Sequence, residues 1–146
     1  SGDVATGSKS TWELVKQQFH EKDLDHVSYL GKIPYTEVQE YIKKANVCVF
    51  PTYAETLGMV TIESMAMQKP VVNSNIGWAQ ELMEHGKSGF LVHPSKHEVY
   101  AQHIVALVND KALYENMGNE ALRFVANRFN IQNIVDQNIQ FYKNVL

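Results

Sequence analysis

Two glutamates, Glu55 and Glu63, lie eight positions apart in the segment that is the strongest candidate for a functional site. Before them, Val47-Cys48-Val49-Phe50 is a short apolar run ended by a proline, as expected of a buried parallel strand. After Gly58, the residues 61–67 favour a helix. The segment therefore predicts a strand, a turn that holds one carboxylate, a glycine, and a helix that carries the second carboxylate.

This arrangement is suited to binding an anion with hydroxyl groups attached. A glycine at the mouth of a helix lets the backbone approach a ligand closely, and the free N–H groups there attract negative charge. Phosphates on the helix end and hydroxyls on Glu55 and Glu63 would together hold a sugar nucleotide. Taken singly, each glutamate could equally be a solvated surface acid, so the prediction rests on the combination.

The elements that must position these residues alternate between strands and helices. Strands are predicted over 26–30, 47–50, 70–72 and 90–92, and helices over 11–19, 59–67 and 78–84. Thr36 with Gln39 and Ser95 with Glu98 have the spacing of capping boxes at two further helix starts. Alternation at these spacings predicts an α/β fold, a Rossmann-like parallel sheet flanked by helices.

Two more helices are predicted after these, with Asp110 capping the first and Asn130 starting the second. In the second we expect the apolar residues to face inward; they are Ile131, Ile134, Val135 and Tyr142.

Composition narrows the function further. The net charge of −3 and the lack of a lysine or arginine run argue against nucleic-acid binding. No apolar stretch is long enough to cross a bilayer. We therefore expect a cytoplasmic protein, and a full-length protein that could also bind peripherally to the membrane. Cys48, the single cysteine, lies in an apolar strand, where inert packing is expected. The six histidines form no convincing ligand set, so no metal and no cofactor is expected.

The order and spacing of several segments closely resemble the C-terminal, donor-binding domain of the family 4 retaining glycosyltransferases, which have the two-domain GT-B fold. The resemblance covers about residues 26–130. Its matching segments are Tyr29-Leu30-Gly31-Lys32-Ile33, residues 45–52, the E-x₇-E signature over residues 55–66, Lys69-Pro70-Val71-Val72, Glu81 and Gly89-Phe90-Leu91-Val92.

The resemblance implies a role for each matched residue. Glu55 would bind hydroxyls of the donor sugar and act at the catalytic centre, and Glu63 would bind the ribose. Backbone N–H groups would face the sugar and diphosphate; they belong to Leu57, Gly58, Met59 and Val60. The backbone of Lys32 and Ile33 would border the base. The reaction implied is metal-free, retaining transfer of a sugar from a nucleoside diphosphate to an acceptor.

The sequence departs from the family pattern at its beginning. The family domain opens with two strands, and an arginine and a lysine after the first clamp the diphosphate, whereas Ser1-Gly2-Asp3 matches the end of the second strand. The only arginines are Arg123 and Arg128, far from that position. We interpret residues 1–146 as a single partial donor-binding domain, with a polar start over 1–10, an α/β core over 11–128 and a C-terminal helix over 130–146.

Such a fragment is expected to be inactive alone, because the acceptor would bind to a missing N-terminal domain. The exposed edge of an incomplete sheet would also favour self-association. Two other functions stay open at this point: a sugar-nucleotide epimerase of GT-B architecture, and a non-catalytic Rossmann-like binding module.

Overall fold

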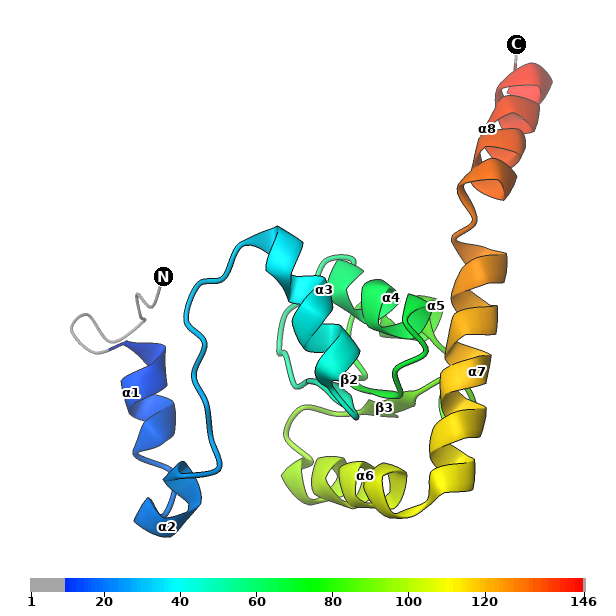
Figure 1. Cartoon of the computed structure of the whole chain (residues 1–146). Helices are drawn as coiled ribbons and strands as arrows, with labels where there is room; N and C mark the ends of the chain where they lie inside the picture. The colour runs from blue at the N-terminus through cyan, green and yellow to red at the C-terminus, as the bar shows by residue number, and fades with distance from the viewer. Residues whose placement is uncertain (1–9, 146) are drawn as a thin grey trace. The chain divides into compact units, whose positions relative to one another are not determined.

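The computed structural model describes residues 10–145. The chain divides into two compact units, Ser1–Val38 and Gln39–Leu146, which are described separately (Figure 1). The predicted polar start and the match of Ser1-Gly2-Asp3 to a strand end lie almost wholly outside the described residues. The single partial domain over 1–146 stays a prediction.

The first unit contains two short helices, α1 (Thr11–Lys16) and α2 (Glu21–Leu24). Ser10 caps α1, because its side chain accepts a hydrogen bond from the backbone N–H of Glu13 at 3.2 Å. Trp12 stacks on Tyr29 with ring centroids 4.8 Å apart. Neither helix has a buried residue, and this ring stack joins α1 to the segment after α2 by an apolar contact.

The strand predicted over 26–30 is wrong. Residues 27–30 form no regular secondary structure, and the described part of the chain supplies no strand to pair with them. A β-strand depends on a neighbour for its hydrogen bonds, so an apolar alternation without one stays irregular. The helix predicted over 11–19 is confirmed in a shorter form.

Helix α3 (Tyr35–Lys44) spans the boundary between the units. The capping box predicted at Thr36 and Gln39 is wrong, because the helix already begins at Tyr35 and Thr36 lies inside its first turn. The box predicted at Ser95 and Glu98 is wrong as well.

At that second box the hydroxyl of Ser95 contacts Nδ1 of His93 at 2.8 Å, and the N-cap of the following helix is Lys96. The predictions for Asp110 and Asn130 are confirmed. Asp110 accepts from the N–H of Leu113 at 2.9 Å, and Asn130 accepts from the N–H groups of the two residues after Ile131.

The second unit is built on a parallel sheet, as predicted. Its strands are β1 (Cys48–Phe50), β2 (Val71–Ser74) and β3 (Phe90–Val92), and they lie side by side in that order. Phe50 pairs with Asn73, and Ser74 pairs with Val92, so the carboxyl ends of all three strands reach the same edge. These two pairings bring together the segments that carry the predicted site.

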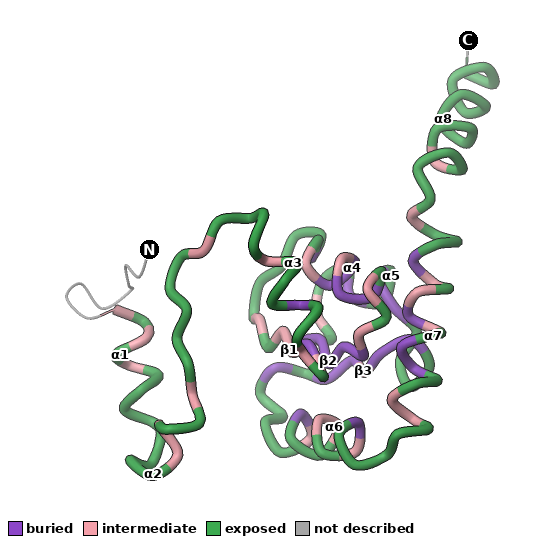
Figure 2. The backbone as a smooth tube through the Cα atoms, in the orientation of Figure 1, coloured by how far each residue is buried: buried purple, intermediate pink, exposed green. Residues whose placement is uncertain are grey.

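Helices cover both faces of this sheet. Helix α4 (Met59–Ala66) packs on β1 and β2, and α6 (His97–Asn109) packs on β2 and β3 from the opposite side (Figure 1). Helix α5 (Ala79–Leu82) follows β2, and α7 (Lys111–Arg128) packs against α4 and α6. Buried residues gather in the strands and on the facing sides of the helices (Figure 2), with a central cluster of Val72, Val92, Tyr100, Leu107 and Met117.

Helix α8 (Ile131–Val145) contradicts the predicted inward face. None of its residues is buried, and Ile131 and Tyr142 are 74% and 62% exposed (Figure 2). Its apolar residues recur at helical spacing, and the predicted helix is confirmed. No helix or strand of the described residues packs on these apolar residues, so the predicted inward face is wrong. Among the described residues, no helix is long and apolar enough to cross a membrane.

Candidate functional site

The carboxyl ends of β1 and β2 border a small cavity of about 10 Å³. Its lining residues come from the end of β2, from the loops after the two strands and from α5; they are Thr52, Glu55, Thr56, Leu57, Asn73, Ser74, Ile76, Trp78, Ala79 and Leu82. Ligands of open α/β sheets bind outside the carboxyl ends of the strands. We call this cavity, the loop 51–58 and the first turn of α4 the strand-end site.

Gly58 sets the geometry of this site. It is the N-cap of α4 and has φ +70° and ψ +48°, in the left-handed region that favours glycine. A Cβ atom at this position would lie 3.1 Å from Cδ1 of Leu82 and 3.5 Å from Cγ of Glu55. The backbone N–H groups of Met59 and Val60 follow at the first helical positions, where a helix offers them no acceptor. The predicted helix mouth is therefore present.

Glu55 lies over this helix mouth, in the loop that the sequence predicted. Its side chain is exposed, and one carboxylate oxygen accepts a hydrogen bond from the N–H of Thr56 at 2.8 Å. Gly77 approaches from the β2 side, since a Cβ there would lie 3.5 Å from the carbonyl oxygen of Glu55. Gly77 thus lies close to the backbone of Glu55 and Gly58 close to its side chain, while the second carboxylate oxygen accepts no hydrogen bond from the described residues.

The other predicted residues of this segment occupy α4 or the residue before Gly58. Leu57 and Met59 are exposed, Val60 is half-buried, and Glu63 is a half-buried residue one turn after Met59. The structure brings these residues and Glu55 together in one strand–loop–helix segment. Lys32 and Ile33 belong to the first unit, so their predicted place beside the base stays a prediction.

Sequence reasoning missed a buried polar network at the same strand ends. Ser74, the last residue of β2, donates a hydrogen bond to the carbonyl of Phe50 at 3.1 Å, and its oxygen lies 2.9 Å from the hydroxyl of Tyr100. Asn73 is also buried, and its side-chain oxygen accepts from the N–H of Ser74 at 3.0 Å. Two polar residues closing an otherwise apolar strand were the available signal, because a buried polar group needs a partner.

Burial raises the pKa of the Tyr100 hydroxyl, and its hydrogen bond with Ser74 opposes that shift only in part. The phenol therefore stays protonated at neutral pH and can donate. Burial likewise raises the pKa of Cys48, which keeps this thiol protonated and agrees with its predicted inert role. Among residues 10–145, no cluster of histidine, cysteine, aspartate and glutamate could hold a metal ion.

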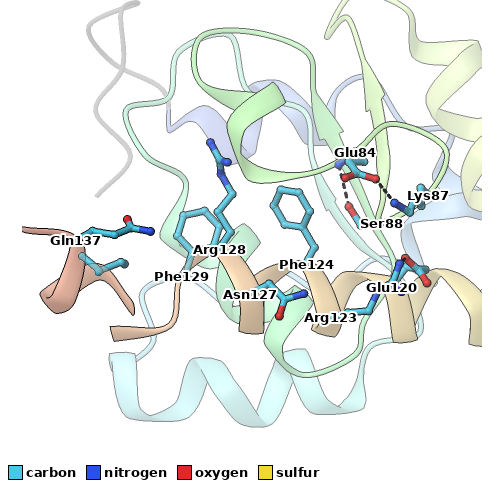
Figure 3. Close-up of a pocket in the computed structure, with 11 residues that line it drawn as sticks. Glu84, Lys87, Ser88, Glu120, Arg123, Phe124, Asn127, Arg128, Phe129 and Gln137 are labelled. Carbon is cyan, nitrogen blue, oxygen red and sulfur yellow. Dashed lines mark hydrogen bonds and ion pairs between the residues drawn. The ribbon is translucent and has the colours of Figure 1, made fainter. Parts of the chain in front are cut away.

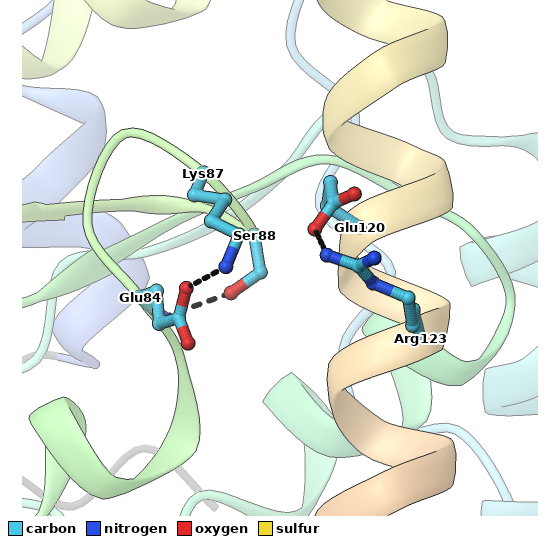
Figure 4. Close-up of polar contacts among 5 residues, drawn as sticks. All are labelled: Glu84, Lys87, Ser88, Glu120 and Arg123. Atoms are coloured by element: carbon cyan, nitrogen blue, oxygen red, sulfur yellow. Dashed lines mark hydrogen bonds and ion pairs between the residues drawn. The ribbon is translucent and has the colours of Figure 1, made fainter.

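A larger hollow of about 750 Å³ shares no lining residue with the strand-end site. It lies between the loop after α5 and the end of α7 (Figure 3). Its cations are already engaged: Lys87 pairs with Glu84, Arg123 pairs with Glu120 (Figure 4), and Arg128 pairs with Glu81. A hollow whose positive groups are neutralised offers little attraction to a diphosphate, so size alone does not make it the functional site.

We expect Gly58→Ala to lower stability and to disturb the strand-end site. A left-handed non-glycine residue costs about 1–2 kcal/mol, and the new methyl group would press on Leu82. Gly86→Ala is the matched control, because Gly86 has φ +77° but open space around its Cβ position. Denaturant unfolding should show a greater loss of unfolding free energy for Gly58→Ala than for Gly86→Ala. Only Gly58→Ala should weaken ligand binding at the strand-end site. An equal loss in the two variants would exclude a packing role for Gly58.

Comparison with known proteins identifies relatives across most of the chain. The family model described as glycosyl transferases group 1 matches residues 4–124. A capsular polysaccharide biosynthesis glycosyltransferase, CapM from Staphylococcus aureus, is 33% identical over 106 residues, which are 73% of this chain and 28% of that protein. An N-acetyl-alpha-D-glucosaminyl L-malate synthase from Bacillus anthracis is 30% identical, with 84% of this chain and 32% of that protein covered.

Solved structures of other proteins have the same fold as this chain. A sucrose-phosphate synthase from Thermosynechococcus elongatus superposes with a TM-score of 0.80 at 30% identity, over 99% of this chain and 37% of its own. HepE from Anabaena, in complex with UDP, superposes with a TM-score of 0.84 at 25% identity, over 97% and 38% of the two chains. The chain thus spans about a third of the length of the relatives it matches.

Proposed function

The chain belongs to the group 1 glycosyl transferases, and we propose that its strand-end site binds the nucleoside-diphosphate sugar of a retaining sugar transfer. One observation carries the proposal: Glu55 is held over the mouth of α4 at the carboxyl ends of the parallel strands. The family match favours sugar transfer over the epimerase and over a non-catalytic module.

Each part of the site suits one part of such a donor. The N–H groups of Met59 and Val60 can receive the diphosphate, since the end of a helix favours anions. The carboxylate of Glu55 can accept hydrogen bonds from sugar hydroxyls, and Glu63, further along α4, can accept from the ribose. Solved structures of HepE contain UDP and UDP-glucose, which supports this class of ligand.

In the proposed reaction the bond between the anomeric carbon and the diphosphate oxygen breaks, and the acceptor hydroxyl bonds to that carbon. The proton of the hydroxyl passes to the leaving diphosphate. The N–H groups at the helix mouth stabilise the negative charge that develops on the leaving group, and preorganised dipoles of this kind are a large catalytic term. Glu55 orients the sugar for this displacement.

We propose that the acceptor is bound by a part of the enzyme beyond this sequence, because the relatives are about three times as long. The fragment alone should then bind donor weakly and not transfer sugar. Positioning of two reactants can account for about 7–11 kcal/mol of barrier lowering, and the family's arginine and lysine clamp has no match here. The outer edge of β1, which no strand among residues 10–145 pairs with, remains a proposed surface for self-association.

Glu55→Gln tests the proposed function most directly. In the intact enzyme it should spare the affinity for free nucleoside diphosphate but reduce turnover with the sugar donor, because the neutral amide accepts more weakly from hydroxyls. Isothermal titration with diphosphate and steady-state kinetics measure the two effects separately. Glu98→Gln, on an exposed residue of α6, is the matched control. Equal weakening of diphosphate and donor binding in Glu55→Gln would contradict a role at the sugar.

Transfer by the intact enzyme should also continue in the presence of EDTA. The expectation rests on the proposed use of helix-mouth N–H groups for the diphosphate charge, which would otherwise call for a divalent cation. Rates with and without chelator, compared after exhaustive removal of metal, measure the effect. Transfer that stops on chelation and returns with magnesium or manganese would refute metal-free binding.

A further inference from the structure

The last residues of the three strands are joined through the hydroxyl groups of Ser74 and Tyr100. Phe50, Ser74 and Val92 end β1, β2 and β3. Ser74 Oγ donates to the Phe50 carbonyl at 3.1 Å, and the Tyr100 hydroxyl lies 2.9 Å from Ser74 Oγ and 3.4 Å from the Val92 carbonyl. Tyr100 belongs to α6, which covers the sheet from the face opposite α4.

Two hydroxyl groups supply the protons of this network. Ser74 donates to the Phe50 carbonyl at 3.1 Å, and Tyr100 donates to the Val92 carbonyl at 3.4 Å. In the 2.9 Å contact between Ser74 Oγ and the Tyr100 hydroxyl, either group can be the donor. The Val92 carbonyl also accepts from the N–H of Asn75 at 2.9 Å. The loop that leaves β2 is therefore tied to the end of β3 as well.

We propose that Tyr100 is a positioning residue for the strand-end site, holding the ends of β1, β2 and β3 in register through Ser74. The loops that leave β1 and β2 carry Glu55 and Gly77, which approach each other closely, and both loops line the same cavity as Ser74. Ser74 and Tyr100 are 1% and 5% exposed, so water does not compete for their hydrogen bonds. For donor affinity, the inference rests on the proposed function.

Tyr100→Phe removes the hydroxyl and keeps the ring in the central core cluster. In the intact enzyme we expect amide hydrogen exchange to rise about 3- to 10-fold over residues 52–58 and 75–79, the range that the loss of one hydrogen bond produces. The affinity for UDP-glucose should fall by a similar factor. Ser74→Ala should have the same two effects. The double variant should lose less binding free energy for UDP-glucose than the sum of the losses in the two single variants, because the two side chains share one hydrogen-bond network.

Two controls separate positioning from general destabilisation. Tyr114→Phe removes a hydroxyl from a half-buried tyrosine of α7. Tyr114 does not line the strand-end site and does not belong to the hydrogen-bond network of Ser74 and Tyr100. Val125→Ala removes buried apolar volume elsewhere in α7. Neither should change exchange over 52–58 and 75–79 selectively.

Each outcome of the exchange measurement either supports the positioning role of Tyr100 or contradicts it. Local exchange that rises only in Tyr100→Phe and Ser74→Ala supports the positioning role. Exchange unchanged in Tyr100→Phe, or raised as evenly as in Val125→Ala, overturns it. If unsubstituted enzyme binds neither UDP nor UDP-glucose while exchange still rises locally, the donor assignment fails and the positioning of the two loops stands.

Discussion

Gly118→Ala should destabilise the second unit by about 2 kcal/mol, although alanine is the better helix former. In an unconstrained helix interior this replacement would add about 1 kcal/mol of stability. Here Gly118 is buried in α7, and a Cβ atom would lie 2.5 Å from the backbone carbonyl oxygen of Gln68, just after α4. Because this neighbour is backbone, α7 must move away from α4, and overpacking of this kind typically costs about 1–3 kcal/mol or more.

Thermal unfolding measures this effect, and the midpoint should fall by roughly 5–10 °C for a unit of this size. Asn116→Ala, at an exposed position of the same helix, should leave the midpoint unchanged or slightly higher. The comparison isolates the close approach of α7 to the end of α4, the helix that carries Glu63. A Gly118→Ala variant as stable as the unsubstituted protein would show that α7 does not constrain α4.

Glu63→Ala should weaken the binding of all nucleoside diphosphates to the intact enzyme by roughly 10- to 100-fold. A hydrogen bond to a charged group contributes about 1.5–3 kcal/mol, and the ribose, shared by every such ligand, would lose that acceptor. Glu63 is a half-buried residue of α4, one turn after the helix mouth.

Calorimetric titrations with UDP, ADP and GDP measure the loss, and Glu98→Ala serves as the control at an exposed glutamate. Melting temperatures of the variants should accompany the titrations, since Glu63 also has interactions within the protein. Unchanged affinity for all three nucleotides in a folded Glu63→Ala protein would remove Glu63 from the site.

The sequence predicted the core of the second unit well because local and tertiary signals agree there. The apolar run before Pro51, the glycine at 58 and the helix after it appear where the pattern placed them, and the family E-x₇-E match falls on the same segment. The predictions failed where an element depends on a neighbour. The run 27–30 has a strand composition and no described partner, and the apolar stripe of α8 has no described surface to cover it.

The strand-end network escaped prediction for a different reason. Asn73 and Ser74 read as the start of a polar loop, but they are the buried end of β2, and the partner of Ser74 lies 26 positions later on α6. Side-chain contacts between distant segments follow from sheet register and helix packing, which periodicity does not specify. The ring of Tyr100 is apolar, so apolar periodicity along its helix gives no signal for the hydrogen bonds that its hydroxyl makes.

A nucleoside-diphosphate sugar should bind at the carboxyl ends of β1 and β2. Backbone amide NMR of this chain, titrated with UDP-, ADP- and GDP-sugars, tests this placement most directly and detects weak binding. For at least one of these ligands, we predict shift changes concentrated in residues 55–63 and 73–79. Shift changes confined to the hollow around Glu84 and Arg123, or none with any of the three at millimolar concentration, would contradict donor binding at the strand-end site.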